Sequence, residues 1–410
     1  MGVGTANAFG LTQYSGVDGS FFSHGAYLSE GAGYGIILGV SGAFILLVLA
    51  LVWADSRYGD TRYHSEEFNT AGRTIKTGLI AVDITSHWTW SSTMLQSTNQ
   101  AFQYGVSGGL WFAAGAVIQI FFFGPVAVEI KRRAPFCHTV LEIVASRWGN
   151  GPRVIFLYFL LITNVIVSAQ LILGGSAVIS ALTGVNIYAA VFLIPIGVLI
   201  YTCVGGLKAT FTSSYVHTVI IFIGLCLFGF VTYATGHVLG SPGAMYDHLQ
   251  YISQLHPVDG NRHGSYLTLF SLSGIKFGIL QVMSCWGIVF ADQAYWQSAI
   301  AARPTAAWKG YILGGLMWYA VPFGLATSLG LTVKALDLPL TSKEANSGLV
   351  PAAAGLAILG KGGGVVVAIM VLMAITSSGS AEMVAISSLL TYDVYIPFIR
   401  KNKNPSGKLA

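Results

Sequence analysis

The stretch GLIAVDITSHWTWSSTMLQSTNQ, residues 78–100, decides how this chain is interpreted. It is as long as a membrane-spanning helix, yet it carries Asp83, His87, two tryptophans and a run of hydroxyl side chains. Polar and ionisable groups cost several kcal/mol each in hydrocarbon unless they face a partner or a water-filled cavity. Bonding of Ser and Thr hydroxyls to their own helix backbone is the alternative, but it accounts poorly for the acid, the imidazole and the indoles. We therefore expect this segment to line a path or a binding site.

The composition of the chain is that of an integral membrane protein. Its 410 residues are 54% hydrophobic and 9% charged, whereas soluble domains average about 25% charged residues. About 20 apolar residues suffice to cross a bilayer. Nine segments meet this requirement, at residues 34–54, 77–102, 108–130, 153–182, 186–206, 211–236, 267–299, 308–332 and 364–392. Long alternating segments of the β-barrel kind are missing, so we predict an all-α multi-pass membrane protein.

The distribution of basic residues predicts the orientation of the chain in the membrane. With the N-terminus outside and the C-terminus cytoplasmic, 16 of the 21 Lys and Arg residues fall in the inner loops and tail, as the positive-inside rule requires. These loops account for the net charge of +5, so nucleic acid is not an expected partner. The four cysteines lie in apolar segments or beside a basic loop, so no disulfide framework is expected.

A second interrupted span contains SCWGIVFADQAYWQ, residues 284–297. A glycine weakens the helix there, and Asp292 follows among aromatic residues. Aromatic side chains near membrane ends are usually interfacial anchors, which is a fair alternative for Tyr295 and Trp296. Trp286 lies nearer the middle of the span and is the stronger pocket candidate. Two interrupted spans at corresponding positions of successive helix groups are typical of inverted-repeat transporters, which bind substrate near the midplane.

A third polar stretch, AITSSGSAE, covers residues 374–382. Neighbouring hydroxyls followed by a glycine suit the coordination of a small hard cation, which prefers oxygen ligands. Small residues that permit tight helix packing explain the same pattern equally well. This stretch by itself leaves both interpretations open.

Motifs along nearly the whole chain resemble those of the sodium/solute symporter family. The matching stretches are TVLEIVASRWG (139–149), VGGLKATFTSSYVHT (204–218), DQAYWQSAIAARP (292–304) and ITSSGSAEMVAISSLLTYDVY (375–395). Within the family, the chain is most similar to the high-affinity urea active transporters of fungi and plants. That similarity is carried by EEFNTAGRTIKTGL (66–79), HWTWSSTMLQS (87–97), EIKRRAPFCHTVLEI (129–143), LGSPGAMYDHL (239–249), VDGNRHGSYLT (258–268) and ATSLGLTVKALDLPL (326–340).

The resemblance implies a LeuT-like core of two inverted repeats of five helices, with one additional helix before it. Residues 34–54 would form the additional helix, 77–236 the first repeat and 267–392 three helices of the second repeat. An extracellular segment at 1–33 and a cytoplasmic tail at 393–410 would flank them. On this basis the chain stops after the eighth core helix, so we expect a truncated bundle.

The resemblance also implies where a coupling cation binds. In sodium-coupled relatives, backbone carbonyls of the first core helix and hydroxyls of the eighth hold the ion. The matching positions are Ala81 and Ile84 on the first helix and Ala374, Ser377 and Ser378 on the eighth. The urea transporters of plants and fungi use protons, so the coupling cation is a proton or a sodium ion. The titratable candidates for proton coupling are Asp83, His87 and Glu382.

The implied substrate, urea, is small, planar and neutral, with two amino groups and one carbonyl. A site for it would hold it between aromatic faces and satisfy its edges, because each buried hydrogen bond left unmade costs roughly 1–3 kcal/mol. Candidate substrate-binding residues are Trp88, Trp90, Trp286, Phe290 and Tyr104 as walls, and Asp83, His87, Gln96, Ser284 and Asp292 as polar contacts.

These observations predict a secondary active transporter of the plasma membrane that imports urea by cation symport with alternating access. Its partners would be urea or a similar small polar solute and the lipid bilayer, while the oligomeric state stays open. No cofactor besides the coupling cation, no metal beyond sodium and no enzymatic activity are expected, since catalytic motifs are missing. Two alternatives remain: a symporter for another small solute such as a polyamine, and a truncated member inactive in transport.

Overall fold

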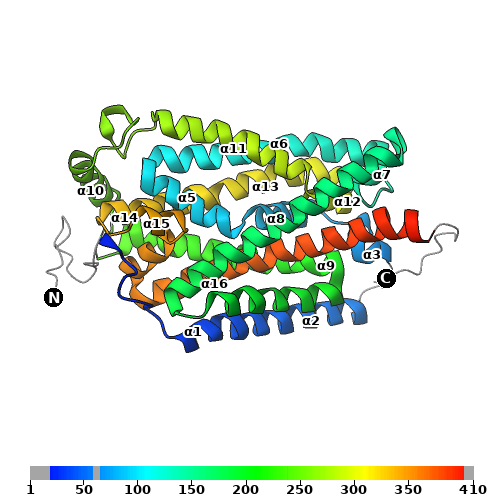
Figure 1. Ribbon diagram of the computed structural model, residues 1–410, viewed down its shortest axis with the longest axis horizontal. Coiled ribbons are helices and arrows are strands. Elements are labelled where there is room, and N and C mark those ends of the chain that lie inside the picture. The colour runs from blue at the N-terminus through cyan, green and yellow to red at the C-terminus, as the bar shows by residue number, and fades with distance from the viewer. Residues whose placement is uncertain (1–18, 59–64, 238, 401–410) are drawn as a thin grey trace.

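The computed structural model describes residues 19–58, 65–237 and 239–400, which form an elongated bundle of helices (Figure 1). The helices are α1 (Glu30–Tyr34), α2 (Ser41–Tyr58), α3 (Ser65–Thr70), α4 (Thr77–Trp88), α5 (Ser91–Tyr104), α6 (Val106–Arg133), α7 (Val140–Trp148), α8 (Asn150–Thr183), α9 (Ile187–Phe230), α10 (Pro242–Leu255), α11 (Leu272–Phe290), α12 (Gln293–Ala301), α13 (Pro304–Leu325), α14 (Leu331–Ala335), α15 (Ser342–Asn346) and α16 (Val350–Ser388). Short π-helical segments adjoin them at Gly35–Val40, Val231–Thr235, Ala326–Gly330 and Leu389–Ile399.

The predicted fold class is confirmed. Within the described residues, β-structure is limited to two isolated bridges, and the rest of the regular structure is helical. Residues 1–18 and 401–410, which belong to the predicted extracellular segment and cytoplasmic tail, lie outside the described residues.

Seven helical stretches within the described residues are long and apolar enough to cross a membrane. Two of the nine predicted segments, 186–206 and 211–236, join into one of these stretches, Ile187–Thr235. The predicted segment 77–102 forms two short consecutive helices, α4 and α5, neither of which is long enough to qualify. Each predicted segment contains a helix. Nine segments become seven stretches because two of them join at a corner in α9 and one is interrupted between α4 and α5.

The corner lies at Gly206, which divides the long helix α9. Its backbone has φ 57° and ψ −153°, a region that residues other than glycine rarely adopt. A Cβ atom at this position would lie 2.6 Å from the ring of Phe68 and 2.8 Å from its carbonyl oxygen. The glycine therefore permits both the change of direction in α9 and the close packing of α3 against it.

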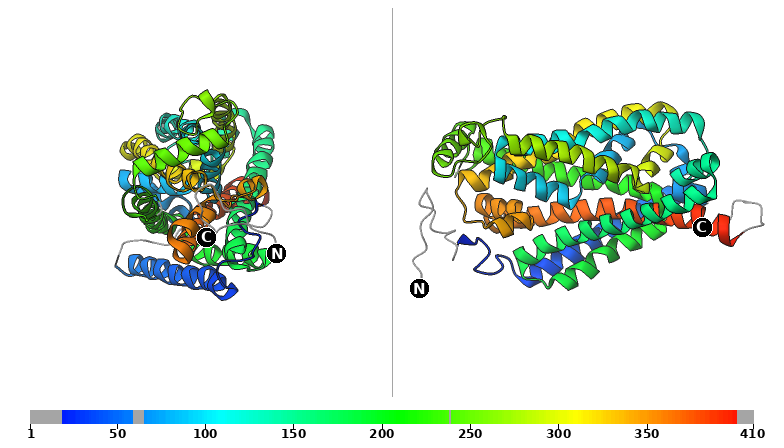
Figure 2. Two further views of the ribbon diagram at one scale, coloured as in Figure 1. Left: turned by 90° about the vertical axis from the view of Figure 1, so that its left-hand side faces the viewer. Right: turned by 45° about the horizontal axis from the view of Figure 1, so that its top comes forward.

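The helices pack around two hydrophobic cores. The first core joins α4, α6, α12 and α13 and fully buries Ile80, Phe123 and Tyr311. The second core joins α8, α9 and α16 and fully buries Phe228 and Val371. The helix α2 packs against α9 at the edge of the bundle (Figure 2). Because α4 contacts both α9 and α16, and α12 contacts α16, the first core meets the second along these two short helices.

The two ends of the bundle are formed by different short helices. Figure 1 shows α10, α14 and α15 at one end and α3, α7 and α12 at the other. We refer to the second as the α3–α7 end. It carries the basic residues Arg73, Arg132 and Arg133, which the charge distribution assigns to the inner side of the membrane.

Replacement of Gly206 by alanine is expected to destabilise the fold, because the unfavourable φ and the contact with Phe68 act together. A left-handed backbone at a non-glycine residue costs about 1–3 kcal/mol by itself. Thermal unfolding of the detergent-purified protein, followed by tryptophan fluorescence, measures the effect. Gly229→Ala is the matched control, because an added Cβ there, also on α9, would have no heavy atom within 4 Å. Equal unfolding temperatures for the two variants would contradict this explanation of the corner.

Candidate functional site

The first interruption separates α4, which ends at Trp88, from α5, which begins at Ser91. Thr89 and Trp90 between them have non-helical backbone conformations. The Thr93 hydroxyl donates to the Trp88 carbonyl oxygen at 3.1 Å and accepts from the Trp90 N–H at 3.3 Å. Backbone groups freed from a helix within a bilayer need hydrogen-bond partners. The Thr93 hydroxyl is the partner of two such groups, at a break that contains no proline.

The second interruption separates α11, which ends at Phe290, from α12, which begins at Gln293. The Asp292 carboxylate caps α12 by accepting from the Ala294 N–H at 2.9 Å. The Trp296 indole N–H donates to the Phe290 carbonyl oxygen at 3.1 Å. Polar side chains of the same segment thus satisfy the backbone at this break as well.

A cavity of about 300 Å³ is lined by residues from both interrupted segments. Its apolar and aromatic lining consists of Trp88, Trp90, Phe112, Ala116, Phe277, Cys285, Ile288, Val289, Tyr295 and Trp318. Its polar lining consists of four primary amides and three hydroxyls: Gln96, Gln119, Gln170, Gln281, Ser92, Thr93 and Ser284. None of the described residues that line it carries a charge. Such a lining suits a neutral solute that both donates and accepts hydrogen bonds.

Three polar atoms of this lining have no hydrogen-bond partner in the described part of the chain: Trp88 Nε1, Trp318 Nε1 and Gln119 Oε1. The Cys285 thiol contacts the same glutamine side chain but leaves its oxygen unsatisfied. A buried polar atom without a partner costs roughly 1–3 kcal/mol. A solute that offers both an acceptor and a donor would therefore be stabilised at these positions.

Four of the predicted substrate-binding residues line the cavity, namely Trp88, Trp90, Gln96 and Ser284. The other aromatic candidates do not line it. Trp286 is 36% exposed, and its ring packs against Phe122 and Phe290 on the outside of the bundle. Tyr104 belongs to a smaller core near α10.

The acidic and imidazole candidates lie on other sides of the interrupted helices. Asp83 Oδ2 accepts from the Ser298 hydroxyl of α12 at 2.7 Å, and Oδ1 accepts from the Ser214 hydroxyl of α9 at 3.4 Å. His87 Nε2 lies 3.1 Å from Asp83 Oδ1. These contacts connect α4 to helices of both cores, and Asp292 serves as the cap of α12. None of the three lines the cavity.

Three of the four amide side chains that line the cavity are not among the predicted substrate-binding residues. Gln119, Gln170 and Gln281 come from three different helices, α6, α8 and α11, and each lies alone in an apolar run. A single uncharged polar residue within a span is a weaker signal than an acid or a histidine. Listing every amide within the predicted spans would have found them, because a primary amide in hydrocarbon also needs a partner.

The predicted cation-binding residues lie on two helices that contact one another, α4 and α16. The hydroxyls of Ser377 and Ser86 are 2.5 Å apart, and the Ser378 hydroxyl donates to the His87 carbonyl oxygen at 3.2 Å. The Ala81 carbonyl oxygen accepts from the Thr85 hydroxyl of its own helix. Ala81, Ile84 and Ala374 are all buried, but Ile84 packs in the first core and Ala374 in the second. Hydroxyls of α16 thus approach oxygen atoms of α4, but at Ser86 and His87 and not at the predicted Ala81 and Ile84.

Residues 68–409 match the family model described as the Sodium:solute symporter family. The chain belongs to this family. The resemblance inferred from its motifs is confirmed, and membership identifies it as a multi-pass membrane protein of a family of cation-coupled transporters.

Relatives within the family include several named as urea transporters. The urea-proton symporter of Oryza sativa subsp. japonica is 52% identical over 421 residues, covering 98% of this chain and 58% of the relative. The urea active transporter of Saccharomyces cerevisiae is 44% identical, covering 93% of this chain and 53% of the relative. The probable urea active transporter 1 of Schizosaccharomyces pombe is also 44% identical, covering 91% and 58%. The chain therefore spans a little over half the length of these relatives.

A solved structure shares the fold at low sequence identity. It is the substrate-bound outward-open state of a Na⁺-coupled sialic acid symporter, with a TM-score of 0.68 and 15% identity. The match covers 91% of this chain and 75% of the symporter. This similarity supports the LeuT-like arrangement of the helices.

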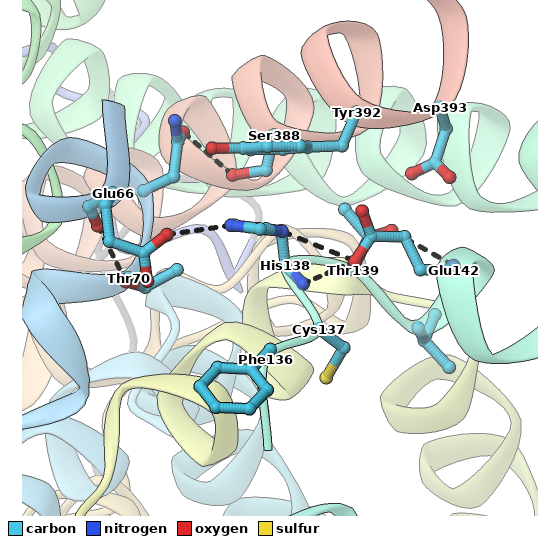
Figure 3. A network of polar contacts seen from close by, with 12 residues as sticks. Glu66, Thr70, Phe136, Cys137, His138, Thr139, Glu142, Ser388, Tyr392 and Asp393 are labelled. Carbon is cyan, nitrogen blue, oxygen red and sulfur yellow. Dashed lines mark hydrogen bonds and ion pairs between the residues drawn. The ribbon is translucent and has the colours of Figure 1, made fainter. Parts of the chain in front are cut away.

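A polar network joins several elements at the α3–α7 end of this symporter-family chain (Figure 3). His138 lies at its centre, with Nε2 2.8 Å from Glu66 Oε2 and its ring stacked on Tyr392 at 4.0 Å between centroids. The backbone N–H of His138 donates to Glu142 Oε2 at 2.7 Å. Nearby, Arg153 donates to Asp393 Oδ1 through Nη2 at 2.7 Å and through Nε at 2.9 Å. Side chains therefore connect α3, α7 and α8 to the π-helical segment Leu389–Ile399 that follows α16.

Electrostatics favour the ionised form of Glu142 in this network. Burial alone would raise the pKa of Glu142, but hydrogen bonds from His138 and the nearby charge of Arg153 outweigh burial. The pKa of Glu142 therefore lies below its usual value of 4.5. A carboxyl whose pKa is lower in the folded than in the unfolded state stabilises the fold at pH values above the unfolded-state pKa. This contribution is lost as the pH falls through the folded-state pKa.

Replacement of Glu142 by glutamine is expected to lower the unfolding temperature near neutral pH, because the charge-assisted bonds to His138 are lost. The difference between wild type and variant should shrink as the pH falls below 4.5, where the carboxyl of the unfolded chain takes up a proton, and go on shrinking until the folded carboxyl is protonated at a lower pH. Thermal unfolding at a series of pH values measures both effects. A difference that stays constant down to strongly acidic pH would contradict the assigned role of the carboxylate.

Proposed function

We propose that this chain forms the substrate-binding part of a secondary active transporter that imports urea together with a cation. The observation that carries the proposal is the uncharged cavity of amides and aromatic rings between two interrupted helices. The names of its relatives in rice and two yeasts support urea as the solute. Transport proceeds by alternating access around this cavity, as in other inverted-repeat transporters.

The chemistry of the cavity matches urea in three respects. Glutamine side chains present both N–H donors and carbonyl acceptors, which complement the carbonyl and the amino groups of urea. The rings of Trp88 and Tyr295, whose centroids are 3.8 Å apart, form part of an aromatic wall for a planar solute. The absence of charge among the described lining residues disfavours a polyamine, because Asp83 and Asp292 are engaged elsewhere.

The helix arrangement supports the assignment of two repeats at 77–236 and 267–392. The interruption between α4 and α5 opens the first repeat, and the interruption between α11 and α12 opens the second. Corresponding broken helices that bind solute and ion are the mark of this class of transporter. We further propose that the α3–α7 end faces the cytoplasm and that the protein acts in the plasma membrane with its N-terminus outside.

The proposal is tested by uptake of radiolabelled urea into proteoliposomes that contain the protein, with an inward proton or sodium gradient. Saturable uptake driven by one of the two gradients is expected. Gln119→Leu should raise KM about fivefold, because one hydrogen bond to the solute is worth about 1 kcal/mol.

Gln254→Leu is the matched control, since Gln254 is exposed on α10 and does not line the cavity. It should leave KM unchanged. Lack of saturable urea uptake under either gradient would overturn the proposed function, and an unchanged KM in Gln119→Leu would overturn the placement of the solute.

A further inference from the structure

Two carboxyl groups meet where α12 packs against α16. Asp292 precedes the first turn of α12, and Glu382 lies within α16. The two helices are held together by Ala294 against Ala381 and Ala385. Asp292 is fully buried and Glu382 is 3% exposed. Asp292 lies two residues before Ala294 and Glu382 one residue after Ala381, so both acids lie at this helix contact, where each acts electrostatically on the other.

The surroundings of the pair supply too few donors for two carboxylates. Asp292 Oδ1 accepts from the Ala294 N–H, but Oδ2 has no donor in the described part of the chain. Glu382 Oε2 accepts from the Asn164 amide of α8 at 2.5 Å. Tyr295 is also close enough to interact electrostatically with both acids, and within the described chain no Lys or Arg is a main electrostatic neighbour of either one. Two acceptors are therefore placed against each other without a cation between them.

A single proton resolves this arrangement. Two carboxylates that share a buried site cannot both ionise without strong repulsion. One proton converts the contact into an O–H···O hydrogen bond and gives the unsatisfied Asp292 oxygen a partner. We propose that Asp292 and Glu382 form a proton-binding site that shares one proton, and that this proton is the coupling ion of transport. The inference rests on the proposed urea symport and deepens it.

The position of the pair explains how its proton would act on the solute. Asp292 belongs to the interrupted segment beside the first core, whereas Glu382 and Asn164 belong to helices of the second core. Loss of the proton leaves two negative charges across this contact and weakens it. Tyr295, three residues after Asp292, lines the cavity and packs against Trp88 at 3.8 Å between centroids. Proton release would thereby loosen the contact that positions one wall of the cavity.

The other buried acid near the cavity is a weaker candidate. Asp83 accepts from the hydroxyls of Ser298 and Ser214 and lies beside His87, so its oxygen atoms already have donors. No group of three or more His, Cys, Asp and Glu residues within the described chain could hold a metal ion. Of the two sites, the acid pair is thus the one where an added proton satisfies an otherwise unpaired carboxyl oxygen.

The test separates coupling from solute binding by comparing two modes of urea movement in proteoliposomes. Accumulation is driven by an inward pH gradient, whereas exchange of labelled for unlabelled urea at equal pH needs no net proton movement. Glu382→Gln keeps an acceptor for Asn164 and offers a permanent donor to Asp292, which mimics the protonated pair. Asp292→Asn offers a permanent donor to Glu382, which also mimics the protonated pair, and its side-chain oxygen can still cap α12.

Both variants are expected to lose pH-driven accumulation while retaining exchange. Glu129→Gln, at an exposed carboxylate paired with Arg132 and Arg133, is the control and should retain both activities. Retained accumulation in either pair variant would overturn the proposal. Loss of exchange in both variants would also overturn it, because the pair would then be needed for the fold or for solute binding. Wild-type accumulation driven by a sodium gradient alone would overturn it as well. Failure of the wild type to move urea in either mode would instead reject the proposed function.

Discussion

The structure depends on the satisfaction of backbone polar groups at two interruptions of membrane helices. In a bilayer, a break without partners for its N–H and C=O groups costs several kcal/mol for each group. Here the partners come from the interrupted segments themselves: the Thr93 hydroxyl at the first break, and the Asp292 carboxylate and Trp296 indole at the second. Because these side chains secure the breaks, the cavity between them can present amide and aromatic groups to a solute.

The contact between the two hydrophobic cores includes several hydrogen bonds between buried polar side chains. Asp83 bonds hydroxyls of α9 and α12, and Ser86 bonds Ser377 of α16. Packed cores shift between discrete arrangements and do not deform continuously. Loss of these polar contacts is therefore one cost of moving the two cores relative to one another, a movement that the proposed alternating access requires.

The helices and the first interruption could be predicted because their signals are local. Apolar length identifies each span, and the polar run at 78–100 identifies the segment that supplies Trp88, Trp90 and Gln96 to the cavity. The placement of α11 could not be predicted in this way, because its rotation depends on another helix. A Cβ at Gly115 of α6 would lie 2.6 Å from the Gly278 carbonyl oxygen of α11. This close approach turns Gln281 towards the cavity and Trp286 to the outside.

An uncharged cavity of amides and aromatic rings should select a neutral amide over a cation of the same shape, and competition between solutes measures this selectivity. Guanidinium has the planar shape of urea but carries a positive charge, whereas acetamide is neutral and keeps one amide. Inhibition of labelled urea exchange should therefore be stronger with acetamide than with guanidinium, because none of the described residues that line the cavity is a carboxylate that could offset the desolvation of a cation. Guanidinium that competes as well as acetamide, or better, would contradict this selectivity.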